Sequence, residues 1–143
     1  MKYFILLFLF AGFFTAAQQK NTFVTDSKTG KQMLLGFIDR TVLTDTTFAS
    51  WYDPEYKDYN VDIPSLDVVV NNLKDISITI VLGTWCSDSH MQVPRFLKIL
   101  DAVSFSYEDN LTLIAVDRSK HGLANETADM DIKAVPTFII FKN

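Results

Sequence analysis

Residues 79–96, "TIVLGTWCSDSHMQVPRF", join an apolar run to an amphipathic stretch and decide the fold. Residues 76–82 are almost continuously apolar and rich in β-branched side chains, which predicts a strand covered on both faces. Residues 89–103 carry apolar side chains at helical spacing, which predicts a helix. Cys86, the only cysteine of the chain, lies where the strand gives way to the helix.

The position of Cys86 predicts a reactive thiol. The first N–H groups of a helix have no internal partners, and the helix dipole adds positive charge there, so both favour a thiolate. Ser89 could donate a hydrogen bond to the sulfur, Trp85 would shield one side, and Asp88 would repel the thiolate. His90 could favour the thiolate, but we interpret it as a solvated surface residue. The alternative for Cys86 itself is a small, buried, inert side chain.

The same patterns predict the other elements. Asp26 and Gly30 are turn formers in an expected hairpin over residues 23–38. The aromatic residues 44–59 indicate a packing face in two short helical pieces, or one kinked helix, because Pro54 interrupts them. We further expect a helix at 62–74 and strands at 111–116 and 135–141. Residues 117–131 form a polar segment, for which the alternatives are a loop and a short helix. This alternation predicts an α/β fold with parallel strands at its centre.

The N-terminal residues 1–17 have the pattern of a signal peptide. Lys2 precedes an uncharged apolar run over residues 3–14, and small residues follow at 15–17. We expect cleavage after Ala17, which leaves Gln18 as the first mature residue, with an uncleaved membrane anchor as the alternative. Export predicts a periplasmic or secreted protein without stable membrane insertion, in a compartment that permits disulfides.

Composition and charge narrow the function further. The chain has 143 residues, of which 48% are hydrophobic and 21% charged, as expected for one globular domain. Its formal net charge is −4 and it has no basic cluster, which argues against nucleic-acid binding. One cysteine and two histidines at no recognised ligand spacing predict neither a metal site nor a cofactor.

The residues around Cys86 resemble the thioredoxin superfamily. "TWCSDSHMQVP" is similar to the family's Trp-Cys-Gly-Pro-Cys segment, with Trp85, Cys86 and Pro94 at matching positions. "VPTFIIFKN" resembles its cis-proline strand, with Pro136 facing the active-site cysteine, and "LIAVD" resembles a central strand. The resemblance is closest to exported thioredoxin-like proteins of Bacteroidetes-type bacteria that carry a Trp-Cys-x-Asp-Ser motif.

The resemblance implies a thioredoxin-like fold, with a central mixed sheet flanked by helices, over residues 62–143. Residues 18–61 would be an N-terminal extension outside the core fold. Ser89 stands where the family has its resolving cysteine, and Ile80 where it has a buried acid. The sequence ends at Asn143, where the family continues with another strand and helix, so we expect a truncated fold whose last strand is an exposed apolar edge.

The implied function is that of a monothiol oxidoreductase. Cys86 would attack protein or small-molecule disulfides, Ser89 would stabilise its thiolate, and an external thiol would resolve the mixed disulfide. The substrate would lie against Trp85, Val135 and Pro136. The alternative is a non-catalytic module that binds proteins or peptides in the same groove, with the aromatic residues 48–59 extending its surface.

Overall fold

The computed structural model describes residues 19–70 and 72–142. The predicted signal peptide, residues 1–17, lies outside the described residues. In chain order the elements are β1 (Thr22–Thr25), β2 (Gln32–Ile38), the 3-10 helix η1 (Arg40–Thr44), α1 (Ala49–Asp58), α2 (Ile63–Val70), β3 (Ile76–Leu82), α3 (Ser87–Ala102), β4 (Leu111–Ala115) and β5 (Thr137–Lys142).

The described strands form one mixed sheet in the order β1-β2-β4-β3-β5. At its centre β3 and β4 run parallel, with Ile80 opposite Leu113. β2 pairs antiparallel with β4, and β5 pairs antiparallel with β3. The expected α/β class with parallel strands at the centre is therefore confirmed.

We had expected residues 18–61 to lie outside the core fold, but the structure places part of them within it. β2 is a full strand of the sheet, and Gly36 is the partner of Ala115 in β4. The cluster of side chains between the sheet and α3 also takes residues from this part of the chain: Leu34, Ile38, Leu43, Phe48 and Tyr52. The expectation was wrong because these apolar side chains fill the same interior that α3 and β3 line.

The hairpin between β1 and β2 closes through the predicted turn. The backbone carbonyl of Asp26 accepts hydrogen bonds from the N–H groups of Thr29 and Gly30. Gly30 has φ +69°, a conformation that costs glycine nothing but strains other residues. The Asp26 carboxylate accepts a further hydrogen bond from the Lys28 N–H at 3.0 Å, which tightens the turn.

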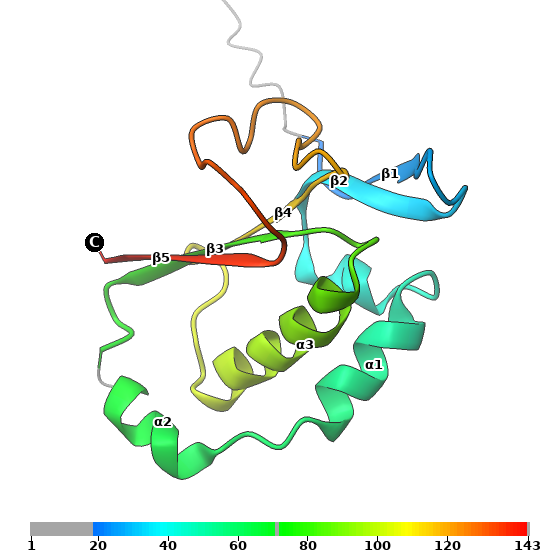
Figure 1. Cartoon of the computed structure of the whole chain (residues 1–143). Coiled ribbons are helices and arrows are strands. Elements are labelled where there is room, and N and C mark those ends of the chain that lie inside the picture. Colours follow the sequence, from blue (N-terminus) through cyan, green and yellow to red (C-terminus); the bar gives the residue numbers. More distant parts are fainter. Residues whose placement is uncertain (1–18, 71, 143) are drawn as a thin grey trace, which may run out of the picture.

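Helices α1 and α3 lie on one side of the sheet (Figure 1). Their shared core includes Tyr52 from α1 and Leu97 from α3, against Ile80 and Leu82 of β3. Of the two alternatives considered, two helical pieces or one kinked helix, the first is wrong, because α1 continues as one helix through Pro54. Packing of the buried Tyr52 against the core holds the helix together despite the hydrogen bond that proline removes.

The loop of residues 116–136 lies on the other side of the sheet (Figure 1). It contributes Val116 and Val135 to a second apolar cluster with Val81 and Ile114. Its polar part forms turns without the short helix that we had considered. One cause is Asp117, whose carboxylate accepts the backbone N–H groups two and four residues further on and so competes with helical hydrogen bonding.

The helix α2 is shorter than the helix expected over residues 62–74, and it has no buried residue. Val68 is 78% exposed, and its neighbours Val69 and Val70 are also exposed. Helical spacing marks one apolar face at Leu66, Val69, Val70 and Leu73, which predicts an inner face for this helix. That prediction is wrong for Val69 and Val70, because no other described element packs closely over the helix. Among the described strands β5 forms one edge of the sheet, with Ile140 and Phe141 exposed, as predicted.

Candidate functional site

Residues 83–86 form a tight turn between β3 and α3. The Cys86 N–H donates to the Gly83 carbonyl at 2.9 Å, and the Cys86 carbonyl accepts the first intrahelical hydrogen bond from His90 at 3.0 Å. Cys86 is thus the N-cap residue of α3, with extended backbone angles, and its side chain caps no N–H group. The sulfur is therefore free to face away from the helix. The predicted place of Cys86 is confirmed.

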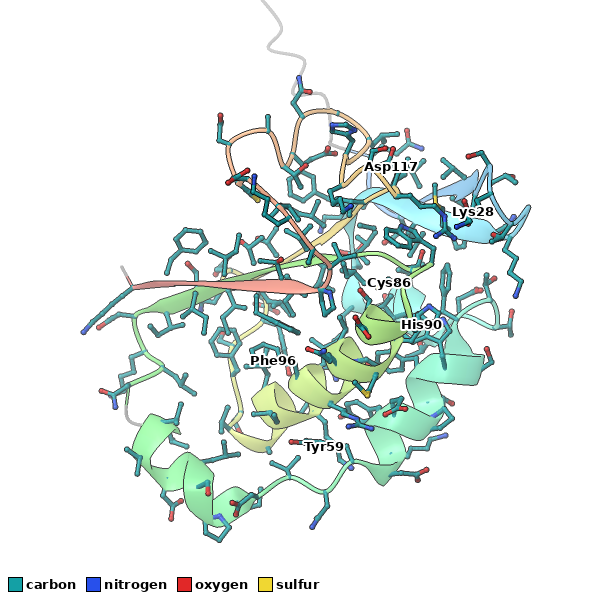
Figure 2. All side chains as sticks on the ribbon, viewed as in Figure 1. Lys28, Tyr59, Cys86, His90, Phe96 and Asp117 are labelled. Atoms are coloured by element: carbon teal, nitrogen blue, oxygen red, sulfur yellow. The ribbon has the colours of Figure 1, made fainter. Side chains whose placement is uncertain are left out.

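The Cys86 sulfur points toward the start of β5. The thiol donates to the Val135 carbonyl oxygen across 3.4 Å, and the Val135–Pro136 peptide bond that follows is cis. Cys86 is half-buried, and Figure 2 shows it at the start of α3. The structure thus brings Cys86, Val135 and Pro136 together across 49 residues of sequence, as the resemblance implied.

Trp85 is held beside the sulfur by contacts on three sides. Its indole Nε1 donates to the Val116 carbonyl at 2.8 Å, which ties the loop to the end of β4. The Arg118 guanidinium lies over its ring, 4.7 Å from the centroid. On a third side the ring rests on Gly83, where an added Cβ would stand 2.7 Å from it. Trp85 is therefore fixed in place, and it packs against the same apolar cluster as Cys86.

Ser89 does not take the role that its position suggested. Its side chain is fully buried, and its hydroxyl oxygen accepts a hydrogen bond from the Gly83 N–H at 3.2 Å. The hydrogen bonds recorded for the described residues include none between Ser89 and the Cys86 sulfur. Ser89 thus fixes the loop that carries Cys86, because it satisfies a backbone donor that would otherwise be buried without a partner.

His90 is not the solvated surface residue that we had expected. Its ring stacks on Trp51 of α1, with the centroids 4.3 Å apart. Its Nε2 lies 2.8 Å from the Thr84 carbonyl oxygen, and because a carbonyl only accepts, Nε2 carries the proton and donates it. The sequence prediction failed because the stacking partner lies in another helix. His90 therefore joins α1 to the Cys86 loop.

Sequence reasoning missed an ion pair at the edge of the site. Arg118 Nη2 lies 2.7 Å from the Asp26 carboxylate, which is almost fully buried. The hydrogen bonds from Arg118, Thr29 and the Lys28 backbone hold the pKa of Asp26 well below its usual range. Asp26 in turn raises the pKa of Arg118. The partners are 92 residues apart, and no local pattern signals such a pairing.

Two further features of the described residues bear on the chemistry. In the part of the chain that the structure covers, His, Cys, Asp and Glu side chains form no group of three or more that could hold a metal ion. Within residues 19–70 and 72–142, no helix is both long and apolar enough to cross a membrane.

The fold and site together define a mixed α/β protein with a single half-buried thiol at the start of a helix. Comparison of the chain with models of protein families, with curated proteins and with solved structures gives no match. The function is therefore argued from the geometry of the site.

Proposed function

We propose that this chain is an exported, thioredoxin-like monothiol oxidoreductase that acts in the periplasm or outside the cell. The observation that carries the proposal is the contact of the Cys86 sulfur with the carbonyl oxygen of Val135, directly before Pro136, at 3.4 Å. A parallel β3–α3–β4 unit followed by an antiparallel strand after that proline supports the thioredoxin-like assignment.

The proposed reaction is thiol–disulfide exchange. The Cys86 thiolate attacks one sulfur of a substrate disulfide, a bond forms between these two sulfurs, and the second substrate sulfur leaves as a thiolate that takes up a proton. An external thiolate then attacks the substrate sulfur of the mixed disulfide, and Cys86 is released as a thiolate. The products are one substrate thiol and a disulfide between the external thiol and the other half of the substrate. A second external thiol attacks that disulfide and completes the reduction of the substrate, so the electrons balance without a cofactor.

The surrounding groups support this chemistry in different ways. Trp85 forms a rigid surface for the substrate to lie against. The Val135 carbonyl, which accepts a hydrogen bond from the Cys86 thiol in this structure, can accept one from a backbone N–H of an extended substrate instead. Pro136 follows directly on the same strand. Ser89 positions the Cys86 loop through Gly83 and offers no second thiol. We therefore assign Cys86 as the nucleophile and Ser89 as a positioning residue.

The experiment is reduction of a disulfide substrate by the mature chain, with and without added glutathione. We expect the wild type to turn over only with the added thiol, Cys86→Ala to be inactive, and Ser89→Cys to gain activity because a second thiol can release the partner. Equal turnover by wild type and Cys86→Ala would overturn the proposal. Retention of peptide binding by that variant would then indicate the non-catalytic binding module.

A further inference from the structure

A cavity of about 460 Å³ opens beside the Cys86 loop, between the hairpin and the start of α1. Its volume lies within the roughly 300–1,000 Å³ that is usual for small-molecule sites. Trp85 and the stacked rings of Trp51 and His90 form its aromatic surface. Cys86 does not line the cavity, but Trp85, which does, directly precedes Cys86 in the chain. The cavity therefore lies next to the reacting sulfur and not around it.

The charges that line this cavity are unequal. Arg118 and Lys31 contribute two cations, and Asp26 contributes one carboxylate. Arg118 binds Asp26 through Nε and Nη2, so Nη1 of its planar guanidinium is left for another acceptor within the described residues. Lys31 has no ion-pair partner among the described side chains. One positive charge is thus left over, in a chain whose formal net charge is −4.

Arg118 also links the cavity to the thiol. Its guanidinium covers the Trp85 ring at 4.7 Å. The pKa of Arg118 is raised, mainly by its hydrogen bond to Asp26, so the guanidinium keeps its charge. An anion that bridges Arg118 and Lys31 would therefore be held beside Trp85, the residue that directly precedes Cys86.

We propose that this cavity binds a carboxylate of the disulfide or thiol substrate, through Arg118 and Lys31, while the substrate's sulfur reacts at Cys86. The inference rests on the proposed function and names its substrate class. A substrate for this arrangement carries its carboxylate on a residue close in sequence to its sulfur, because an extended residue spans only about 3.3–3.6 Å. Glutathione disulfide and acidic cysteine peptides both meet this requirement.

The test is a fluorescence titration of the full mature chain carrying Cys86→Ser. Both tryptophans of the protein line the cavity, so their emission reports its occupancy. The probes are N-acetyl-S-methylglutathione and its neutral diester, and a short peptide with glutamate two residues from serine beside the same peptide with glutamine. We expect saturable binding of the carboxylate probes that weakens with salt, and weaker binding of the neutral ones.

The outcomes distinguish a small-molecule substrate from a polypeptide substrate and show whether the carboxylate site exists. Binding of the tripeptide alone indicates a small thiol substrate, binding of the acidic peptide alone indicates a polypeptide, and either result supports the carboxylate site. Equal binding of charged and neutral probes, or no saturable change with either carboxylate probe, overturns it. Because no probe carries a reactive sulfur and the variant has no thiol, this result is independent of the turnover assay that tests the proposed function.

Two lysines of the hairpin turn provide a matched control. Lys31 lines the cavity, whereas Lys28 does not, and Figure 2 shows Lys28 on the hairpin. Lys31→Gln should weaken binding of the carboxylate probes about two- to fivefold, the scale of an exposed ion pair, and Lys28→Gln should leave it unchanged. Arg118→Gln should weaken it on the order of tenfold, with folding checked by thermal unfolding. Equal losses at Lys28 and Lys31 would show only a general charge effect and would overturn the site.

Discussion

Gly83 decides how the Cys86 loop is packed, because its α-carbon leaves room for the Trp85 ring. A Cβ at Gly83 would stand 2.7 Å from Cε2 and 2.9 Å from Nε1 of that ring, and this edge also donates to the Val116 carbonyl. Gly83→Ala should therefore displace the indole and lower the free energy of unfolding by about 1–3 kcal/mol, the usual cost of overpacking. Chemical denaturation followed by tryptophan fluorescence measures the loss.

Gly122→Ala is the control for this prediction. Its added Cβ would meet the flexible carboxylate end of Glu126, which can move aside, so we expect a smaller loss of stability. A loss at Gly122 equal to that at Gly83 would contradict the view that the rigid Trp85 contact sets the cost.

At the scale of elements, Asp101 of α3 connects several parts of the fold. It pairs with Arg40 of η1 and accepts hydrogen bonds from the hydroxyls of Tyr56 in α1 and Tyr107 in the loop after α3. Asp101→Ala removes the shared acceptor, so we expect a loss of about 1.5–3 kcal/mol, as for hydrogen bonds to a charged group. Urea unfolding measures this loss, and Asp109→Ala, which alters an exposed aspartate, is the control. An equal loss of stability in the two variants would contradict the role assigned to Asp101.

The sequence predicted those elements whose signals are local. The apolar run of β3, the helical spacing of α3 and the Asp26 turn need only neighbouring residues, and all three are present in the structure. The pairing of β2 with β4 and the stacking of His90 on Trp51 depend on chain segments that meet only after folding. The spacing of the valines in α2 predicted a buried face, but spacing does not show whether another element packs over them, and none of α2 is buried.

In the candidate site, too, the features with a local sequence signal or a family resemblance were predicted, and the pairing of distant residues that had neither was not. Cys86 at the helix start followed from the strand-to-helix junction, and its contact with Val135 and Pro136 followed from the resemblance. The Arg118–Asp26 pair had no comparable signal, because it joins residues 92 positions apart. The expected hydrogen bond from Ser89 to the sulfur is not among those recorded for the described residues. The Ser89 hydroxyl instead accepts the Gly83 N–H, a backbone group that side-chain spacing does not reveal.

At the scale of the whole molecule, two carboxylates make stability depend on acid pH. Burial raises the pKa of Asp101, but hydrogen bonds from Arg40, Tyr107 and Tyr56 outweigh it and lower the pKa to about 2. The pKa of Asp26 is lowered as well, chiefly by Arg118. Because both pKa values are lower in the folded chain, the unfolded chain binds more protons, and this stabilisation is complete above the unfolded value of about 4.

We therefore predict that the free energy of unfolding falls as the pH drops from about 4 toward 2. Asp101→Asn should show a shallower fall, because one of the two lowered carboxyl groups is gone. Urea unfolding at several pH values in this window measures both slopes. A wild-type stability that stays constant or rises as the pH falls there would contradict the assigned pairs.

The most direct test of the proposed chemistry is the rate at which Cys86 forms a mixed disulfide with glutathione disulfide, followed by intact mass. The native chain is compared with the same chain unfolded in urea at the same pH, and Cys86→Ser serves as the blank. We predict faster adduct formation in the native state, because the helix start and the half-exposed sulfur favour attack. A native rate equal to or below the unfolded rate would show an inert thiol and contradict the assignment of Cys86 as the nucleophile.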